Sequence, residues 1–509
     1  MQNKPNFKTL LLYPKLGSSD AFITYPPLSL IYAAADSVKR KKNVSILDLR
    51  FYPKNYLEIL EKKITPNIKL VGISVMTGSP IKYALEISRF LKTNHNVSIL
   101  WGGIHPTLLP EETLKNKYID YVIAGYGSTA LAELINALEN NYPLEKVVGL
   151  YYKKNGKISA NPSSKKHELI PYEELPYHLV DMKNYFRKTL SQRDIPIFTS
   201  LGCPHQCIFC VAPVLYKSME KKWVAYEINS VIQHIKTLIQ RYQITSITVF
   251  DDDSFIDIKR MIHFFKCCIS SGISKNVKIN FRGVRINELD AMNDKDIALM
   301  VKANVGYIMI GIESGSQRIL DLMKKKISLE AIKRVSKKLS LYPEITPHYN
   351  FFVGMPGETK KDLLNTKELL LELLEDNPHC YLGFGSDWKP IPGSQMTAMA
   401  KQQFNLQIPA TLENWAEIDS FDARSVIRYY WYSKDYERLI RLIQCSSGII
   451  DLKLYKEFIT DKRFFLKLLS ILSLIYRPII MWRIKHSFSR LLIEFPIRNW
   501  LIKHVFTKL

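Results

Sequence analysis

The most informative stretch of this 509-residue chain reads Ile195-Pro196-Ile197-Phe198-Thr199-Ser200-Leu201-Gly202-Cys203-Pro204-His205-Gln206-Cys207-Ile208-Phe209-Cys210. An apolar, strand-like run leads directly into a loop with cysteines spaced C-x3-C-x2-C. Thiolates are the usual protein ligands of iron–sulfur clusters. Three thiolates in one loop can hold three irons of a 4Fe-4S cube and leave the fourth iron open to a substrate. The spacing of Cys203, Cys207 and Cys210 therefore predicts a cluster that takes part in chemistry.

A structural zinc site is the alternative for these cysteines. Zinc sites need a fourth ligand, usually from paired knuckles, and the chain has no second Cys-x2-Cys pair. His205 could complete such a site only by folding back within its own loop. The remaining cysteines show no ligand spacing: Cys267, Cys268, Cys380 and Cys445.

The composition is that of a folded protein with several domains. Hydrophobic residues make up 47% of the chain and charged residues 23%, as in ordinary globular proteins, and the length favours about two to four domains. Seven cysteines in so long a chain do not indicate a secreted disulfide framework, and no signal peptide is visible. We therefore expect a cytoplasmic protein, because a reducing compartment suits free thiols and an oxygen-sensitive cluster.

Residues 1–145 alternate short apolar runs with amphipathic helical patterns. The expected strands are residues 9–13, 44–47, 70–75, 97–101 and 121–124. This alternation predicts an α/β domain with a doubly wound, Rossmann-like parallel sheet. Such sheets bind ligands in the loops beyond the carboxyl ends of their strands. Three of these loops are rich in glycine or hydroxyl groups: residues 74–78, 102–106 and 125–128.

Residues 125–130 also match the dinucleotide fingerprint G-x-G-x-x-A. That fingerprint belongs to the first strand–helix turn, whereas this match follows the fifth strand. The loop after the first strand, residues 14–17, lacks it. A nicotinamide or flavin dinucleotide is therefore not expected.

Residues 146–192 are predicted to be a connector with a hairpin, and residues 193–400 alternate strands and helices again. The expected strands are residues 244–250, 277–281, 307–310 and 349–353. Barrels of this type place their chemistry at the carboxyl ends of strands. Polar or glycine-rich segments follow each strand: Asp251-Asp252-Asp253, Arg282 with Arg285, residues 311–315, and residues 354–359. Asp253 is either a site residue or the cap of the next helix.

The cysteine motif, with the aromatic Phe209 before its third cysteine, resembles the signature of the radical S-adenosylmethionine (SAM) superfamily. With the N-terminal domain included, the resemblance covers about residues 1–400. It implies a partial (β/α)6 TIM-type barrel and a 4Fe-4S cluster whose open iron chelates S-adenosyl-L-methionine. It also implies these SAM contacts: Phe209 near the adenine, Glu313 on the ribose, Ser314 and Arg285 along the site, and Gly354 through its backbone.

Residues 1–145 resemble the cobalamin (B12)-binding domain that precedes the barrel in one branch of this superfamily. The similarity lies in residues 25–30, 72–74, 102–106 and the Gly125-x-Gly127 turn. That turn departs from the branch's acidic Gly-Glu-Gly-Glu, and the Asp-x-His-x-x-Gly element is absent. The resemblance implies cobalamin bound without a protein histidine on cobalt, with His105 shaping the pocket. The expected cobalamin residues are Ser74, Thr77, Gly102, Gly103, His105, Gly125 and Gly127.

The resemblance implies a cobalamin-dependent radical SAM methyltransferase that acts on an unactivated carbon. SAM cleavage would produce a 5′-deoxyadenosyl radical, which abstracts hydrogen from carbons that acids and bases cannot activate. Cobalamin would then supply a methyl group to the substrate radical. The expected partners are a small-molecule, lipid-like substrate and an external one-electron reductant of the flavodoxin or ferredoxin type.

Two other functions stay open. One is a radical enzyme that performs oxidative cyclisation or ring rearrangement, as in the anaerobic magnesium-protoporphyrin ester cyclases, which resemble this chain in outline. The other is a non-catalytic cobalamin sensor bound to membrane or RNA. Methylthiotransferases are disfavoured because they carry further cluster cysteines in their leading domain, whereas every cysteine here lies at or beyond Cys203.

Residues 401–509 are expected to form a helical, basic region. From Lys462 to Leu509 there are ten Lys or Arg and one acid, Glu494, which points to an anionic surface. The longest run without charge, residues 468–476, is far short of a membrane span. Residues 464–509 therefore either lie in the inner membrane surface through Trp482 and Trp500 or form a helical cap on the barrel. Nucleic acid is not the expected partner.

Overall fold

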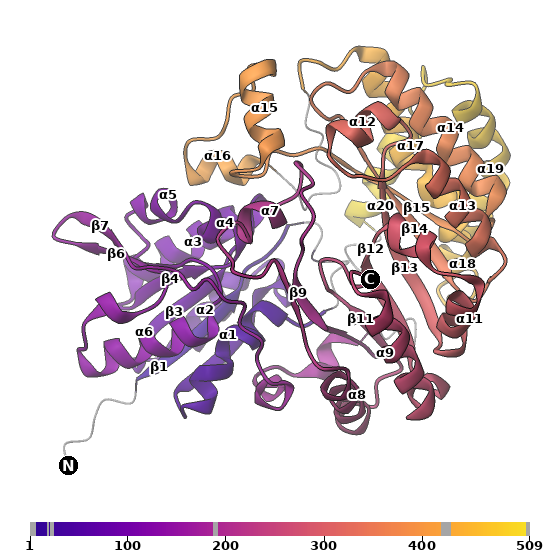
Figure 1. Cartoon of the computed structure of the whole chain (residues 1–509). Helices are drawn as coiled ribbons and strands as arrows, with labels where there is room; N and C mark the ends of the chain where they lie inside the picture. Colours follow the sequence, from indigo (N-terminus) through magenta and orange to yellow (C-terminus); the bar gives the residue numbers. More distant parts are fainter. Residues whose placement is uncertain (1–6, 18–19, 21–24, 187–191, 419–428, 505–509) are drawn as a thin grey trace.

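Two parallel sheets organise the chain, one on each side of the molecule (Figure 1). The computed structural model describes residues 7–17, 20, 25–186, 192–418 and 429–504. The N-terminal sheet and its helices form one half. A second sheet, its helices and the C-terminal helices form the other. The predicted α/β fold class is confirmed.

The N-terminal sheet has seven strands in the order β2-β1-β3-β4-β5-β6-β7. The strands are β1 (Lys8–Tyr13), β2 (Asn43–Asp48), β3 (Ile68–Ser74), β4 (Ser98–Gly102), β5 (Tyr121–Ile123), β6 (Leu150–Lys154) and β7 (Lys157–Ala160). The first five are parallel, and β6 and β7 add an antiparallel hairpin at the edge. The hairpin predicted in the connector therefore extends this sheet.

Helices cover both faces of the N-terminal sheet, as the alternation of side chains along β1 requires. Leu10 and Leu12 pack in the core that contains α3, whereas Leu11 packs in the core that contains α1 and α6. The helices are α1 (Leu28–Lys39), α2 (Tyr56–Lys63), α3 (Ser79–Asn94), α4 (Ile104–Leu108), α5 (Pro110–Lys115) and α6 (Ser128–Asn140). This is the predicted doubly wound arrangement.

The order of the first five strands, 2-1-3-4-5, reverses direction between β1 and β3. Ligands of doubly wound sheets bind at such a switch point, beyond the carboxyl ends of the strands. The loops after β3, β4 and β5 meet at this edge, and they are the three loops that the sequence singled out.

The second sheet has six parallel strands in the order β15-β14-β13-β12-β11-β8. They are β8 (Asp194–Ile197), β11 (Ser246–Val249), β12 (Lys278–Val284), β13 (Val305–Glu313), β14 (Thr346–Val353) and β15 (Tyr381–Asp387). A short antiparallel pair, β9 (Ser200–Gly202) with β10 (Trp223–Ala225), flanks the cysteine loop. The partial (β/α)6 barrel is thus observed.

Helices between these strands cover the outside of the barrel (Figure 1). They are α8 (Ile228–Tyr242), α9 (Ile258–Ser270), α10 (Ile286–Ala291), α11 (Asp294–Lys302), α12 (Gln317–Leu322), α13 (Leu329–Ser340) and α14 (Lys360–Asp376). The short helix α7 (Ala212–Leu215) follows the cysteine loop and lies beside α4 of the N-terminal domain instead (Figure 1). Several begin at strong caps: Asn293 with Asp296 and Thr359 with Asp362 form capping boxes.

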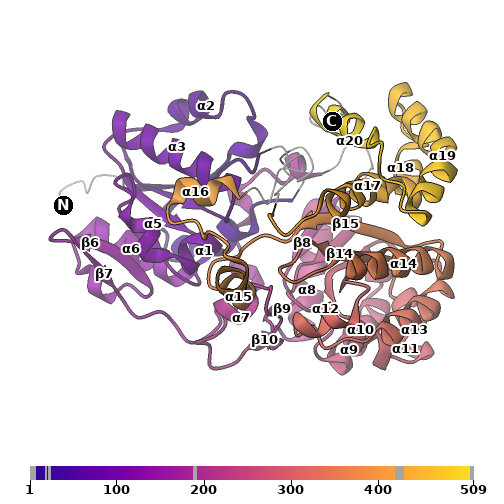
Figure 2. The same cartoon turned by 90° about the horizontal axis from the view of Figure 1, so that it is seen from above.

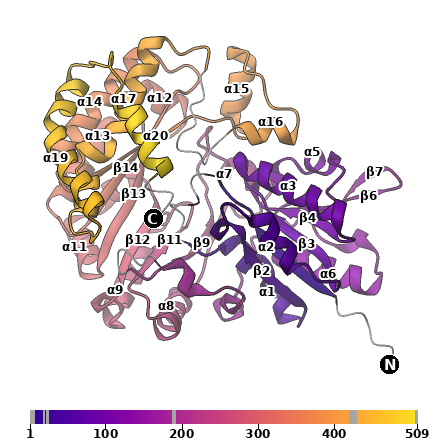
Figure 3. The ribbon, with the colours of Figure 1, turned by 180° about the vertical axis from the view of Figure 1, so that it is seen from behind.

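The region after the barrel divides into two parts. Helix α15 (Gln395–Phe404) leads to α16 (Leu412–Glu417), which lies over the N-terminal domain against α3 (Figure 2). There Leu412 and Trp415 are buried in the core of the N-terminal domain. The remaining helices pack beside β15 and α14: α17 (Lys434–Ile450), α18 (Lys453–Phe458), α19 (Phe464–Lys485) and α20 (Glu494–His504). Helix α19 lies at the side of the barrel away from the N-terminal domain (Figure 3).

Candidate functional site

The three cysteines lie in a loop that β9 and β10 hold at the barrel mouth. Gly202, just before Cys203, has a φ of +90°, and a Cβ there would meet the Lys222 carbonyl oxygen. Only glycine satisfies both conditions. Further along, Ile208 donates its N–H to the Met323 carbonyl (3.1 Å) and its own carbonyl accepts from Met396 (3.0 Å). The loop is therefore fixed at both ends.

The sulfur environment suits iron rather than zinc. His205, the candidate fourth zinc ligand, places its Nε2 3.0 Å from the Asp253 carboxylate. Burial raises the pKa of Cys203 to about 12 and of Cys210 to about 11, so these thiols need a metal to be thiolates at neutral pH. Cys210 is close enough to Cys203 and Cys207 for the thiolates to affect one another's pKa, and three such thiolates would hold a 4Fe-4S cluster through three of its irons.

Three adjacent acids brace the cysteine loop. Asp251 accepts from the Thr199 N–H and hydroxyl (2.6 Å each). Asp252 accepts from the Tyr216 hydroxyl (2.8 Å), and Asp253 faces His205. The cap of α9 is Asp257 instead, which accepts from the Arg260 N–H (2.9 Å). The alternative that Asp253 caps this helix is thus wrong.

Glu313 stands at the end of β13 in an unusual backbone conformation. Its φ is +68°, a region that costs a non-glycine residue about 1–3 kcal/mol and is retained mainly at functional sites. Its Oε1 lies 2.7 Å from Lys325 Nζ, and both side chains are largely buried. The same Nζ is 5.8 Å from the centre of the Phe209 ring. Glu313 and Phe209 therefore converge, as expected for a nucleoside site.

Lys325 is a site residue that the sequence analysis missed. It lies in the run Lys324-Lys325-Lys326, which resembles any solvated lysine run. Only burial separates it: Lys325 is buried, whereas its two neighbours are exposed. A largely buried acid at the end of a strand, such as Glu313, needs a cationic partner. This need is the one sequence-level indication that a nearby lysine pairs with it.

Two other predicted SAM residues differ in placement. Arg285 donates from Nη1 to Cys207 Sγ (3.4 Å) and from Nη2 to the Lys325 carbonyl, so it joins the cysteines to the Glu313 pair. Ser314 points elsewhere: its Oγ contacts Thr366 Oγ1 on α14 (3.3 Å). Its side chain is therefore used in packing α14 against the strand end.

We expect Lys325→Met to weaken SAM binding by at least about tenfold and to destabilise the fold by about 3–5 kcal/mol. The reason is that the Glu313 carboxylate would stay buried without its cation. Calorimetric SAM titration and unfolding midpoints measure both effects. Lys324→Met, at the exposed neighbouring position, is the matched control. Equal effects of the two substitutions would contradict this role of the ion pair.

Gly354 turns the chain after β14 beneath an aromatic cluster. Its φ is +78°, and a Cβ would collide with the Tyr432 hydroxyl. Trp431 Nε1 donates to the Gly354 carbonyl (3.4 Å), and the Trp431 ring stacks on Tyr429 at 4.3 Å. These aromatic residues pack with Phe209. Tyr429, Trp431 and Tyr432 therefore pack on the barrel, whereas Tyr430 is exposed.

Glu358 holds the Gly354 turn from below. Its Oε2 accepts from the Gly354 N–H (2.6 Å) and from the Tyr436 hydroxyl. Burial raises the pKa of Glu358 from its ordinary 4.5 to about 7. The folded protein therefore keeps the proton that the unfolded chain loses, and stability falls as the pH rises from about 4.5 to about 7.

Replacing Glu358 with glutamine should remove most of this pH dependence. The gap between the two pKa values corresponds to about 3 kcal/mol, so Glu358→Gln should raise the unfolding midpoint at about pH 8 and change it little at about pH 5. Thermal unfolding across this range measures the effect. Glu375→Gln serves as the control, because Glu375 is an exposed glutamate near the end of α14. Parallel pH profiles for wild type and Glu358→Gln would refute the assignment.

A cavity of about 420 Å³ lies between the N-terminal domain and the barrel. From the N-terminal domain its wall includes the predicted Ser74, Gly102, Gly103, Gly125 and Gly127. From the barrel side it includes Phe198, Ser200, Leu201, Val211, Leu215 and Tyr216. A Cβ at Gly102 or Gly125 would meet nothing within 4 Å. The glycines therefore leave open space at the sheet's switch point, where the predicted cobalamin would lie.

His105 and Thr77 lie behind this cavity and do not line it. His105 is buried, its Nδ1 is 3.1 Å from Thr77 Oγ1, and its ring lies 5.9 Å from that of Trp415. Burial lowers the pKa of His105 to about 4, so the ring is neutral. The pair lies against the Gly102-Gly103 loop, and neither residue reaches the cavity in which the predicted cobalamin would lie.

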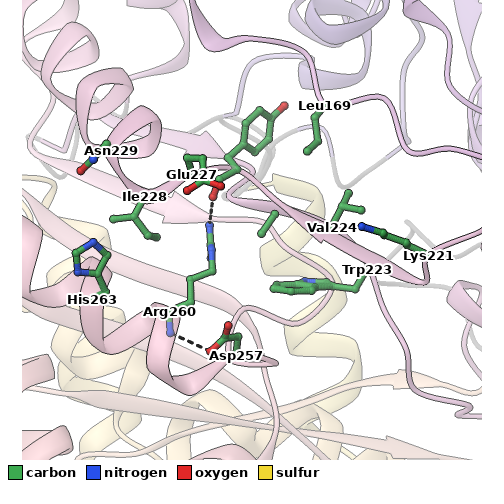
Figure 4. A pocket seen from close by; sticks show the side chains of 12 residues that line it. Leu169, Lys221, Trp223, Val224, Glu227, Ile228, Asn229, Asp257, Arg260 and His263 are labelled. Atoms are coloured by element: carbon green, nitrogen blue, oxygen red, sulfur yellow. Dashed lines mark hydrogen bonds between the residues drawn. The ribbon is translucent and has the colours of Figure 1, made fainter.

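Another cavity, of about 640 Å³, lies elsewhere in the structure (Figure 4). It lies along β10, α8 and α9, and none of the cysteines or predicted cofactor residues lines it. Arg260 at this cavity donates to the Thr199 and Tyr226 carbonyls (2.9 Å each). It fixes β9 and β10, and hence supports the cysteine loop from outside.

Comparisons with known proteins agree with this geometry. Residues 197–370 match the model of the radical SAM superfamily, and residues 23–135 match the B12 binding domain. An uncharacterized methyltransferase, PH0819, from Pyrococcus horikoshii is 28% identical over 475 residues, which cover 90% of this chain and 96% of that protein. The anaerobic magnesium-protoporphyrin IX monomethyl ester cyclase of Synechocystis sp. is 26% identical over 62% of each chain.

Solved structures share the fold across both domains. The cobalamin-dependent SAM radical enzyme OxsB, with aqua-cobalamin and SAM bound, superposes with a TM-score of 0.71 at 16% identity over 98% of this chain and 76% of its own. The radical SAM methyltransferase TsrM from Kitasatospora setae, with cobalamin and a 4Fe-4S cluster bound, gives 0.64 at 17% identity over 77% and 78%.

The fold and site define a radical SAM enzyme with a B12-binding domain. Residues 197–370 belong to the radical SAM superfamily, and residues 23–135 form a B12-binding domain on their N-terminal side. The predicted cofactors are confirmed at the level of these two families: a 4Fe-4S cluster with S-adenosyl-L-methionine, and cobalamin. A small-molecule substrate and an external one-electron reductant follow from the same family. The zinc and sensor alternatives are disfavoured.

Proposed function

We propose that this protein is a cobalamin-dependent radical SAM methyltransferase that methylates an unactivated carbon of a hydrophobic, lipid-like substrate. One observation carries the proposal. The proposed cobalamin loops around Gly102 and Gly125 share a single cavity with Ser200 and Leu201, which lie three and two residues before Cys203. A substrate between cobalamin in this cavity and the cysteine loop would lie between the methyl donor and the radical source.

Each group of site residues would have its own role. When bound, the cofactors supply a 5′-deoxyadenosyl radical and a transferable methyl group. Cys203, Cys207 and Cys210 would hold the cluster, with Arg285 placing positive charge beside the Cys207 sulfur. Glu313, oriented by Lys325, would accept hydrogen bonds from the ribose hydroxyls. The domains enclose the cavity and limit access of water to a reactive radical.

The lining of the cavity supports a hydrophobic substrate. On the barrel side, the wall that would face a substrate beside cobalamin includes the apolar Phe198, Leu201, Val211 and Leu215 together with the polar Ser200, Tyr216 and Asp252. Apolar lining with a small number of oriented polar groups is typical of sites for hydrophobic ligands. Such a substrate suits a cytoplasmic enzyme at the inner face of the membrane, with residues 464–509 as the contact.

Isotope transfer tests the proposal. The protein is reconstituted anaerobically with iron, sulfide and hydroxocobalamin, then incubated with cell extract, reductant and SAM that carries a trideuterated methyl group. A methyltransferase yields a product with one added CD3 group, identified by mass spectrometry. Formation of 5′-deoxyadenosine with no labelled product would overturn methyl transfer and leave the radical chemistry in place.

Oxidative cyclisation is the second candidate, favoured by the similarity to magnesium-protoporphyrin ester cyclases from several organisms. It uses the same cysteines and SAM residues. It differs in the product, which would lose hydrogen and gain no carbon. The trideuterated SAM experiment therefore separates the two functions.

A further inference from the structure

Helix α19 exposes a continuous apolar stripe. Positions 464, 468, 471, 475, 479 and 482 recur at intervals of three and four, so their side chains share one helix face. All are exposed hydrophobic residues: Phe464, Leu468, Ile471, Ile475, Ile479 and Trp482. Phe464 is 80% exposed and Ile475 67%. We call these six residues the α19 stripe. Contiguous exposed apolar surface marks a binding face.

The opposite face of α19 is fixed to the protein. Leu466, Ser470, Ile480 and Ile484 are buried, and the helix packs on α17, α18 and α14. Near its C-terminal end, buried Arg483 pairs with buried Glu494, and Lys367 of α14 donates to the Lys485 carbonyl (3.0 Å). The stripe is therefore the side that these neighbours leave uncovered among the described residues.

Helix α19 is also long enough to cross a membrane. It has 22 residues and is apolar enough by composition, contrary to the expectation drawn from the longest uncharged run. Crossing would detach the helix from α17 and expose the Arg483–Glu494 pair to hydrocarbon, where polar groups are costly. The packed half of the helix therefore favours lying in the membrane surface over spanning it.

The exposed charges within residues 462–504 have one sign. Lys462, Lys467, Lys485 and Arg490 are exposed, whereas Glu494, the one acid between residues 462 and 504, is buried and paired. Lys467 and Lys485 are 18 positions apart (485 − 467), about five helical turns, so both project from the same edge of the stripe. A stripe of apolar residues with a basic edge is complementary to anionic lipid headgroups.

We infer that the α19 stripe docks the protein on the surface of an anionic lipid bilayer, with the helix axis in the membrane plane. Trp482 and Phe464 sit near the two ends of the stripe, and aromatic side chains such as tryptophan favour the headgroup level. The inference deepens the proposed function. It rests on that function only for the biological reason for docking, because a lipid-like substrate would lie in the bilayer. The surface itself is argued from α19 alone.

Vesicle flotation with the holoenzyme tests the docking, with no turnover required. Wild type should float with phosphatidylcholine vesicles that contain phosphatidylglycerol, and much less with phosphatidylcholine alone. The double variant Ile475→Asp/Ile479→Asp should lower the bound fraction by about tenfold or more, because charge at the centre of the stripe must stay hydrated. Leu341→Asp is the control, since Leu341 is 72% exposed at the end of α13.

Separate experiments test the contribution of the basic residues and the in-plane arrangement of the helix. The double variant Lys467→Glu/Lys485→Glu should bind the anionic vesicles more weakly than wild type. The dependence of that binding on salt concentration should also become much smaller. Lys236→Glu, at an exposed lysine of α8, should change neither property. Alkaline carbonate should release a surface-bound protein, so resistance to extraction would overturn the in-plane arrangement.

Two results would overturn the inference altogether. One is wild type that stays unbound with both vesicle types. The other is a lipid-independent dimer in sedimentation velocity that the Ile475→Asp/Ile479→Asp variant dissociates, which would assign the stripe to a second copy of the chain. Neither result bears on isotope transfer from SAM, so a failure here and a failure of methyl transfer are distinguishable.

Discussion

Serine in place of Cys203, Cys207 or Cys210 is expected to abolish reductive cleavage of SAM. Each thiolate would be the sole protein ligand of one iron, and a serine hydroxyl is a poor substitute for a soft thiolate ligand. Formation of 5′-deoxyadenosine under dithionite should fall by more than about three orders of magnitude, equivalent to a loss of about 4 kcal/mol or more. Chromatography of the quenched reaction measures it, and bound iron should fall in parallel.

Cys267→Ser is the control for this series. Cys267 is half-buried on α9 and contacts His263, far in sequence from the cluster loop. The variant should keep its iron and its activity. Retained cleavage in any of the three loop variants, or a loss in Cys267→Ser, would contradict the assignment of the cluster ligands.

Leucine at Gly102 is expected to remove cobalamin without unfolding the protein. A Cβ there meets nothing within 4 Å, and its φ is not in the left-handed region, so the backbone accepts a side chain. That side chain would fill the space proposed for the corrin. Overfilling a packed site costs about 1–3 kcal/mol, and corrinoid affinity should fall by about tenfold to a hundredfold. The absorption spectrum of the reconstituted, desalted protein reports the retained corrinoid.

The matched control is Gly448→Leu on α17. This glycine also has open space at its Cβ position and an ordinary φ, but it lies on the barrel side, far from the cavity residues. It should retain cobalamin at the wild-type level. Iron content should be unchanged in both variants. Full corrinoid retention in Gly102→Leu would remove this cavity from consideration as the cobalamin site.

The sequence predicts most of the strands because their signal is local. Each of the five strands expected in the first 145 residues appears within a few positions, as do the four expected in the barrel. β15 has no expected counterpart. Its sequence, Tyr381–Asp387, contains two glycines and ends in polar residues, so it lacks the apolar run of a buried strand. It is buried by α17, a partner that periodicity cannot reveal.

Some residues of the candidate site can likewise be predicted from local sequence, and others cannot. The cysteines follow from spacing alone, and Glu313 follows from its position at a strand end. Lys325 and Glu358 do not, because their roles depend on burial and on contacts between distant segments. Ser314 shows the converse: the motif around it is intact, yet its hydroxyl is turned toward α14. Sequence patterns identify which loops meet, while side-chain orientation depends on the packing behind each loop.

The return of the chain to the N-terminal domain at α16 has a consequence for loading. Leu412 and Trp415 are buried against α3, beside the His105 that supports the Gly103 loop. Separating the two halves to admit or release a corrinoid would expose both side chains, at about 1.5–3 kcal/mol each. We therefore expect corrinoid exchange to be slow in the folded protein and faster in variants that weaken the packing of α16 on α3.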